Sequence, residues 1–260
     1  MLKSFAGGRL FGGTWGQGPA TVLALHGWRR THADFIPVFE SPEASGLSAL
    51  APDLPGFGAT PAPSAPWGSE DYAKALVALF EEPGALADKV VVVGHSFGGR
   101  VAVRLATMVP ERIERLVLTG VPLFDREGRR SRPVFAYRLV RRLHRLGLVG
   151  DDRLEAMKNK YGSPDYRAAS GVMRDVFVKL LTESYADDMA ALTCPVDLVW
   201  GERDTEVPIE VAERAERAFP SARLIRLRGV GHLVPTEAPA DLRRVIVGQW
   251  ADPGPGVGQP

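Results

Sequence analysis

The sequence has little cysteine, no long apolar segment and almost no net charge. Its 260 residues include one cysteine, Cys194, which excludes an internal disulfide and favours a reducing compartment. No segment is apolar enough for a membrane-spanning helix, and residues 1–8 lack the apolar stretch of a signal peptide. A net charge of +1 gives no reason to expect a nucleic-acid partner. We therefore predict a cytoplasmic protein without stable membrane association.

The spacings that hold metals and phosphates are also missing. The five histidines and the single cysteine form no His-x-x-x-His pair and no Cys/His cluster, and there is no glycine-rich phosphate loop. We predict no metal site and no cofactor. The composition, 45% hydrophobic and 24% charged, is typical of a globular protein with a full-sized core.

Short apolar segments alternate with helical segments along most of the chain. After a glycine-rich start, with two short strands expected before Pro19, the pattern predicts strands at 21–25, 50–52, 90–93, 116–119, 196–200 and 223–227. It predicts helices at 69–82, with Ser69 as N-cap, and at 97–108, 209–218 and 239–250. This alternation favours an α/β fold with a mostly parallel sheet and helices on both faces.

Two segments depart from the alternation. Residues 123–190 contain no clear strand and are interpreted as a helical insertion between two strands of the sheet. Residues 253–260 are rich in proline and glycine and predict a disordered tail. The predicted core domain is therefore made of residues 1–122 and 191–252.

The most informative motif is Gly94-His95-Ser96-Phe97-Gly98, which follows four valines and precedes a predicted helix. A serine at the end of a buried strand must turn sharply into a helix to expose its hydroxyl, and glycines two residues away on each side relieve the crowding. The motif predicts a nucleophile elbow with Ser96 as the nucleophile. The alternative interpretation of Ser96 is an ordinary helix N-cap.

A serine nucleophile needs a base, and the base needs a group that orients it. His232 follows the last predicted strand, and Asp204 follows the strand before it. Because catalytic groups gather at the carboxyl edge of open parallel sheets, we expect both residues there. Asp125, Glu202 and Glu206 are competing candidates for the acid, of which Asp204 is preferred.

The remaining histidines fit the base role less well, since His26 and His95 lie within loop and elbow motifs and His144 lies among arginines. Asp53 begins a tight loop and is interpreted as structural, binding backbone amides. Cys194 precedes a predicted strand and is interpreted as a packed, inert thiol.

Together these residues resemble the α/β-hydrolase superfamily, whose chain order is serine, acid, histidine. The resemblance covers residues 20–122 and 191–250 and rests on five motifs: His26-Gly27, Asp53-Leu54-Pro55-Gly56-Phe57-Gly58, the elbow, Gly201-Glu202-Arg203-Asp204 and Gly231-His232. It implies the α/β-hydrolase fold, with residues 123–190 as an inserted helical cap. Ser96 argues against the haloalkane dehalogenases and epoxide hydrolases of this fold, which use an aspartate at the elbow.

The same resemblance implies the rest of the site. The backbone amides of Trp28 and Phe97 would form the oxyanion hole, and their side chains would wall the acyl pocket. The cap would supply further apolar lining from Met157, Tyr161, Met173 and Phe177.

The predicted cap also contains eight arginines and one acid between Arg126 and Arg145. Apolar residues recur there at helical spacing, namely Phe135, Leu139, Leu143 and Leu146. A solvated basic face paired with the acids of the cap is the favoured interpretation. The alternative is a surface that attracts anionic substrates or an anionic membrane.

The resemblance favours a serine carboxylic ester hydrolase acting on small-molecule esters through Ser96, His232 and Asp204. An alternative within the fold is a C–C bond hydrolase acting on a vinylogous diketone, although Trp28-Arg29-Arg30 stands where such enzymes carry a longer glycine-rich loop. Perhydrolase and amidase side activities would use the same residues. A different class of function would be a ligand receptor with negligible turnover, or an inactive scaffold.

Overall fold

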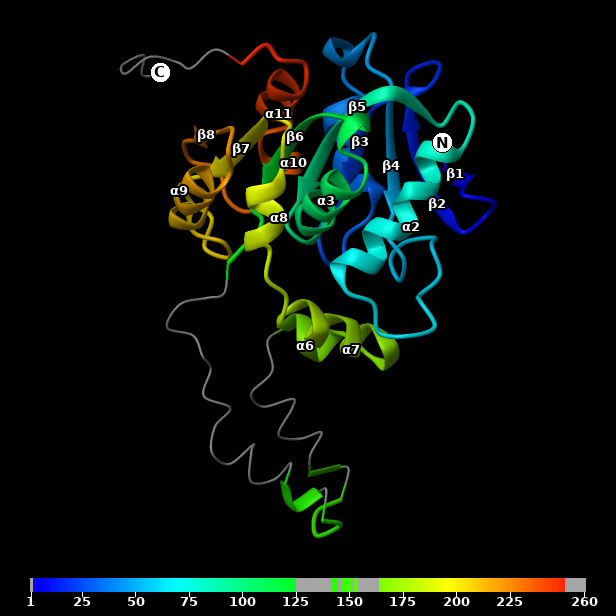
Figure 1. Ribbon diagram of the computed structural model, residues 1–260, viewed down its shortest axis with the longest axis vertical. Coiled ribbons are helices and arrows are strands. Elements are labelled where there is room, and N and C mark those ends of the chain that lie inside the picture. The colour runs from blue at the N-terminus through cyan, green and yellow to red at the C-terminus, as the bar shows by residue number, and fades with distance from the viewer. Residues whose placement is uncertain (1, 125–141, 145, 151, 154–163, 251–260) are drawn as a thin grey trace.

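The computed structural model describes residues 2–124, 142–144, 146–150, 152–153 and 164–250. Within these ranges the chain forms an eight-stranded sheet in the order β1-β2-β4-β3-β5-β6-β7-β8 (Figure 1). The strands are β1 (Leu2–Phe5), β2 (Leu10–Trp15), β3 (Ala20–Leu25), β4 (Ala49–Asp53), β5 (Leu86–His95), β6 (Ile113–Thr119), β7 (Val196–Gly201) and β8 (Ala222–Leu227).

The sheet is parallel from β4 to β8 in this order, and β1 and β2 add an antiparallel edge. Parallel neighbours require crossover connections, and here helices supply most of them. The observed sheet confirms the predicted α/β class with its mostly parallel sheet.

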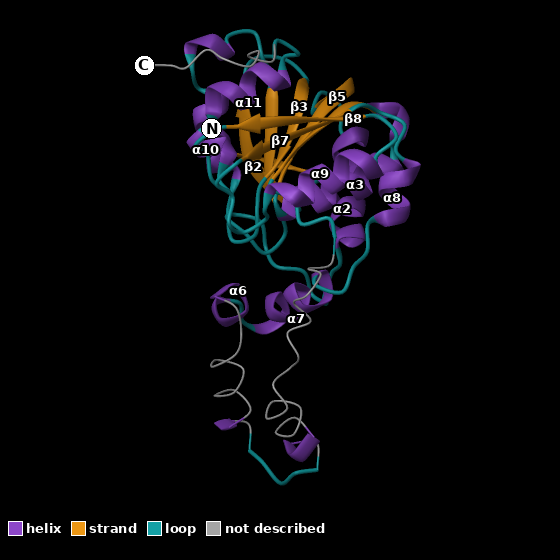
Figure 2. Ribbon diagram, turned by 90° about the vertical axis from the view of Figure 1, so that its left-hand side faces the viewer, coloured by secondary structure: helices purple, strands orange, loops and turns teal. Residues whose placement is uncertain are grey.

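The helices cover both faces of the sheet (Figure 2). On one face lie α2 (Ser69–Glu81), α3 (Phe97–Met108), α8 (Ala186–Ala191) and α9 (Ile209–Ala218). On the other lie α1 (Ile36–Phe39), α10 (Val234–Glu237) and α11 (Pro239–Ile246). Short 3-10 helices occupy His32–Phe35, Pro42–Ala44 and Pro110–Arg112.

Strand β5 lies in the middle of this arrangement and shows why the core has two halves. Val90 and Val92 pack into the core on the α3 side, whereas Val91 and Val93 pack into the core on the α11 side. Successive side chains of a strand point to opposite faces, so a strand covered on both faces is apolar throughout. The run of four valines therefore predicted a buried strand correctly.

Most predicted elements agree with the structure, and the differences have local causes. The bounds of α3 and α9 match the prediction, whereas α11 ends at Ile246 instead of residue 250. The N-cap prediction for Ser69 was wrong, because Gly68 is the N-cap and Asp71 accepts a hydrogen bond from its amide. Both the amide and the hydroxyl of Ser69 bind the carboxylate of Glu183, at 2.9 and 2.6 Å.

Between β6 and β7 the described helices are α6 (Pro164–Ala168), α7 (Gly171–Leu180) and α8. Helices α6 and α7 lie beyond one end of the sheet in both ribbon views. Met189 of α8 is buried in the core beneath α3. The predicted domain boundaries and the tail from 253 onward remain predictions.

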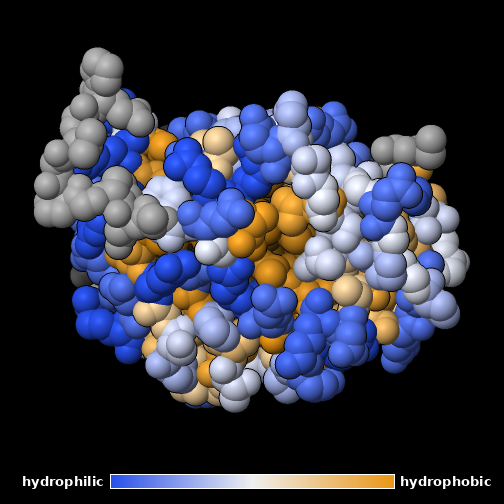
Figure 3. Space-filling view, turned by 90° about the horizontal axis from the view of Figure 1, so that it is seen from above, coloured by the Kyte–Doolittle hydropathy of each residue, from blue (hydrophilic) through white to orange (hydrophobic). Residues whose placement is uncertain are grey.

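The end of the molecule opposite α6 and α7 exposes mostly hydrophilic side chains around a central apolar area (Figure 3). Of the helices in the described ranges, none combines the length and the apolar character needed to cross a bilayer.

The contact between β5, α3 and β3 tolerates no side chain at two glycines. A Cβ on Gly94 would lie 2.5 Å from the Cα of Gly99, and a Cβ on Gly98 would overlap the carbonyl oxygen of Leu25. Both obstacles are backbone atoms, which cannot rotate away. The glycines of the motif are therefore required by the close approach of strand and helix.

We expect Gly98→Ala to lower the free energy of unfolding by about 3 kcal/mol, because the new methyl group overpacks a contact made of backbone. Urea unfolding of the purified variant measures this change. Gly150→Ala is the matched control, since its Cβ would meet nothing within 4 Å. Equal stability of the two variants would contradict the close contact.

Candidate active site

Ser96 lies between β5 and α3 in a strained backbone conformation. Its φ is 50° and its ψ is −113°, and its amide donates to the carbonyl oxygen of Thr119 at 2.8 Å. Non-glycine residues rarely adopt a positive φ, and such strain gathers at functional sites. Among the described residues the other non-glycine residues with positive φ are Ala6 and Arg29. The conformation is that of the elbow that the sequence predicted.

Asp204 and His232 meet at the carboxyl edge of the sheet. Asp204 follows β7 and His232 follows β8, and His232 Nδ1 is 2.8 Å from Asp204 Oδ2. The other carboxylate oxygen of Asp204 accepts from the amides of Glu206 and Val207, at 2.9 and 2.8 Å. These bonds fix a carboxylate whose side chain is 1% exposed. An ionised carboxylate can only accept, so the Nδ1 atom carries the proton and Nε2 is left as the basic nitrogen.

Two residues hold the ring of His232 from the side, and sequence reasoning did not assign them this role. The ring of His95 lies 4.9 Å from that of His232, centroid to centroid. A Cβ on Gly120 would come within 2.8 Å of His232 Nδ1 and Cε1. Gly120 could have been identified from the sequence, because it directly follows a buried strand and therefore lies at the carboxyl edge of the sheet.

Glu206 lies on the solvent side of the same imidazole. Its Oε2 is 3.7 Å from His232 Nε2, and its side chain is 66% exposed. In the described structure Ser96 Oγ and His232 Nε2 are not hydrogen-bonded to each other. Catalytic hydrogen bonds are often long or misaligned outside the Michaelis complex, so this geometry is compatible with a role in proton transfer.

The loop after β3 is fixed by His26, which is fully buried. Its Nε2 accepts from the amide of Leu54 at 2.9 Å, so the proton lies on Nδ1 and is donated to the carbonyl oxygen of Gly27 at 2.8 Å. Burial lowers the pKa of His26 to about 4. Both ring nitrogens are thus committed, which explains why His26 is not the base.

Asp53 organises the neighbouring loop, as its structural interpretation predicted. One carboxylate oxygen accepts from the amide and the ring of His32, each at 2.8 Å, and the other accepts from the amide of Ala59 at 2.9 Å. The interpretation of Cys194 as a buried thiol also holds, and burial raises its pKa.

The side chains of the two residues predicted to supply the oxyanion donors pack against each other. Phe97 is the first residue of α3, so its amide has no acceptor within the helix. Trp28 follows β3, and the rings of Trp28 and Phe97 are 5.5 Å apart. Whether the two amides bind an oxyanion stays a prediction.

An aromatic wall joins the loop after β3 to helix α7 at this point. The ring of Trp28 packs against Phe57 at 4.9 Å and against Phe177 of α7 at 5.2 Å. The structure therefore brings the predicted pocket residues Trp28, Phe97 and Phe177 together. Sequence reasoning missed Phe57 as a wall residue, although its loop had been identified.

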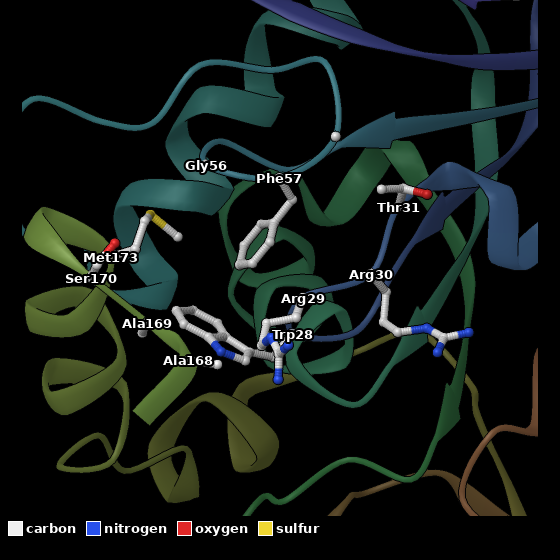
Figure 4. A pocket seen from close by; sticks show the side chains of 11 residues that line it. Trp28, Arg29, Arg30, Thr31, Gly56, Phe57, Ala168, Ala169, Ser170 and Met173 are labelled. Atoms are coloured by element: carbon white, nitrogen blue, oxygen red, sulfur yellow. The ribbon is translucent and has the colours of Figure 1, made fainter. Parts of the chain in front are cut away.

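A pocket of about 330 Å³ opens beside this wall (Figure 4). Three of the described segments line it: the loop after β3, the loop after β4 and the residues from the end of α6 into α7. The lining residues are Trp28, Arg29, Arg30, Thr31, Gly56, Phe57, Gly58, Ala168, Ala169, Ser170 and Met173. Met173, a predicted cap contribution, is thus part of the wall.

Several predicted residues cannot be placed in this site. Met157, Tyr161 and the alternative acid Asp125 lie outside the described residues, as does most of the arginine-rich segment from 126 to 145. Within the described ranges, no group of three or more His, Cys, Asp or Glu side chains could hold a metal ion.

The fold and the geometry of this edge can be compared with known proteins. The model of the Alpha/beta hydrolase family matches residues 22–245. The chain therefore belongs to the alpha/beta hydrolase family, which also confirms the resemblance inferred from the motifs and the predicted α/β-hydrolase fold.

Sequence identity to the individual proteins described next is 28% or less. The chain is 28% identical over 258 residues to a pimeloyl-[acyl-carrier protein] methyl ester esterase of Aromatoleum aromaticum, covering 89% of this chain and 93% of the relative. It is 25% identical over 259 residues to a 2-hydroxy-6-oxononadienedioate/2-hydroxy-6-oxononatrienedioate hydrolase of Cupriavidus pinatubonensis, covering 89% and 87%. A thermophilic esterase from Thermogutta terrifontis shares the fold, with a TM-score of 0.68, 22% identity and coverage of 95% and 97%.

The buried histidines predict how stability depends on pH. Burial lowers the pKa of His26 to about 4 and that of His95 to about 3, so both are neutral in the folded protein at pH 7. The unfolded chain binds these protons near pH 6.5, so stability is lost as the pH falls from about 6.5 towards 4.

We expect His95→Asn to make this loss shallower by up to about 1.4 kcal/mol per pH unit, because one titrating group is removed. Urea unfolding between pH 7 and 4 measures the slope, with His144→Asn in the cap as the control. Identical slopes for wild type and His95→Asn would refute a neutral, buried His95.

The choice between Asp204 and Glu206 as the acid can be tested by labelling Ser96 with a fluorophosphonate. We expect Asp204→Asn to slow labelling by about 10³- to 10⁴-fold, because the imidazole loses the partner that fixes its tautomer. Glu206→Gln should change the rate by less than about 5-fold, since its carboxylate is exposed and screened. The reverse order of effects would assign the role to Glu206.

Proposed function

We propose that this protein is a serine carboxylic ester hydrolase that acts on small to medium acyl esters through an acyl-enzyme intermediate. The observation that carries the proposal is the 2.8 Å hydrogen bond between His232 and the buried Asp204, at the same sheet edge as the strained Ser96. Family membership and the esterase among the relatives support it.

In the proposed reaction, His232 Nε2 removes the proton of Ser96 Oγ as that oxygen attacks the ester carbonyl. The negative charge that develops on the carbonyl oxygen would be held by the amides of Trp28 and Phe97. His232 then gives the proton to the leaving alcohol. The same nitrogen next activates a water molecule, which releases the acid and restores Ser96.

Asp204 would have two roles in this cycle. Accepting a hydrogen bond from Nδ1–H keeps the basic lone pair on Nε2, and the negative charge of Asp204 stabilises the imidazolium formed in each transfer.

We expect wild-type protein to hydrolyse p-nitrophenyl esters of graded acyl length, and Ser96→Ala to lower kcat by about 10⁶-fold, because the nucleophile is lost. The release of p-nitrophenol measures both. Ser45→Ala, at an exposed serine, is the control and should retain activity. Equal rates in wild type and Ser96→Ala would overturn the proposal.

A C–C bond hydrolase is the second candidate, and it is supported by the relative that hydrolyses 2-hydroxy-6-oxononadienedioate at similar identity. The two candidates differ in the bond that breaks. Faster turnover of a vinylogous 1,5-diketone than of every aryl ester, again dependent on Ser96, would favour this alternative. Labelling of Ser96 by a fluorophosphonate without turnover of either substrate would favour a receptor.

A further inference from the structure

The pocket beside Trp28 has one apolar side and one basic side. The apolar side is made by Trp28, Phe57 and Met173, which face the same space in Figure 4. The basic side is made by Arg29 and Arg30. Among the described residues, the lining contains these two cations and no carboxylate.

The two arginines differ in how their donors are used. Arg30 makes a bidentate pair with Asp34, with its Nε and one terminal nitrogen at 2.7 and 2.6 Å from the two carboxylate oxygens. Side-chain hydrogen bonding to Asp34 raises the pKa of Arg30. The two parallel N–H donors of Arg30 that could bind a ligand carboxylate are therefore already bonded to Asp34.

Arg29 has no such partner within the described residues. Its nearest carboxylate is Asp165 of α6, at 3.6 Å, which is too long for a hydrogen bond. Both side chains are about half exposed, at 53% and 47%. Exposed ion pairs of this kind contribute little, so a ligand carboxylate could displace Asp165 without a large penalty.

The backbone conformation of Arg29 is a second reason to single out this residue. Its φ is 57°, a conformation that a glycine adopts without strain and a side chain rarely does. This strained residue directly follows Trp28, whose amide is a proposed oxyanion donor. The guanidinium is thus carried by the loop that would contact the substrate carbonyl.

We propose that Arg29 binds a carboxylate of the substrate, so that the protein prefers esters that carry a second, free carboxylate at the end of an aliphatic chain. The chain would lie against Trp28, Phe57 and Met173, and the carboxylate would accept two parallel hydrogen bonds from the guanidinium. This inference rests on the proposed ester hydrolysis and names its substrate class.

The test compares matched substrates that differ in one terminal group. Mono-p-nitrophenyl adipate and suberate carry the carboxylate on the acyl part, and p-nitrophenyl hexanoate and octanoate are their neutral counterparts. Acetoxyhexanoate and hexyl acetate provide the same comparison with the carboxylate on the alcohol part. We expect wild-type protein to favour the anionic member of at least one series by about 10-fold in kcat/KM.

Two variants at Arg29 measure how much this residue contributes to the preference for anionic esters. We expect Arg29→Asn to reduce the anionic-to-neutral ratio of kcat/KM by about 10-fold, mostly through KM, because the contact is distant from the reacting atoms. Asparagine is chosen because it tolerates a positive φ. Arg29→Lys should keep part of the preference, since it keeps the charge but not the planar fork.

Asp165→Asn separates substrate binding from a purely structural tie between the loop and α6. If Arg29 binds the substrate, removing its competitor should maintain or increase the preference for anionic esters. If Asp165→Asn and Arg29→Asn instead lower kcat/KM equally for anionic and neutral esters, the arginine only ties the loop to the cap and the inference is overturned.

The salt dependence of the preference and the rates on neutral esters provide two further tests. The wild-type preference should shrink between low salt and about 0.5 M salt, because screening weakens an exposed charge contact. Equal kcat/KM for anionic and neutral esters in both series would overturn this inference and leave ester hydrolysis intact. Absence of turnover on all substrates would overturn the proposed function itself.

Discussion

The contact of backbone against backbone where β5 ends, α3 begins and β3 ends is the constraint on which the rest of this structure depends. Gly94 and Gly98 allow it, because a Cβ at either position would collide with main-chain atoms. The approach holds Ser96 at a φ of 50° at the carboxyl edge of the sheet. It also brings Phe97 beside Trp28, so the nucleophile and both proposed oxyanion donors are set by one packing contact.

Burial gives three histidines of this edge different chemistry. His26 and His95 are fully enclosed, which keeps them neutral and lets them hold the surrounding loops by specific ring nitrogens. His232 lies at the rim, where its Nδ1–H donates a hydrogen bond to Asp204 and Nε2 is left as the basic nitrogen. The residue type is the same in each case, and the surroundings decide whether it supports the fold or is suited to proton transfer.

The short loop after β3 combines several proposed functions. The amide of Trp28 is a proposed oxyanion donor, its ring packs against Phe57 and Phe177, and Arg29 follows in a strained conformation. The same loop approaches α6 through the 3.6 Å ion pair of Arg29 and Asp165. Substrate preference and chemistry are therefore coupled over a few residues in this proposal.

The sequence by itself determined which segments form strands and helices, because apolar periodicity is a local property of the chain. The bounds of α3 and α9, the burial of the four valines on both faces of a strand and the candidate residues at strand ends all follow from it. The tertiary structure alone decided contacts between distant segments. Examples are Gly120 against His232, Ser69 bound to Glu183 instead of capping α2, and Arg29 beside Asp165. Such contacts depend on how the elements pack, and residues separated by tens of positions leave no local pattern that records which of them will meet.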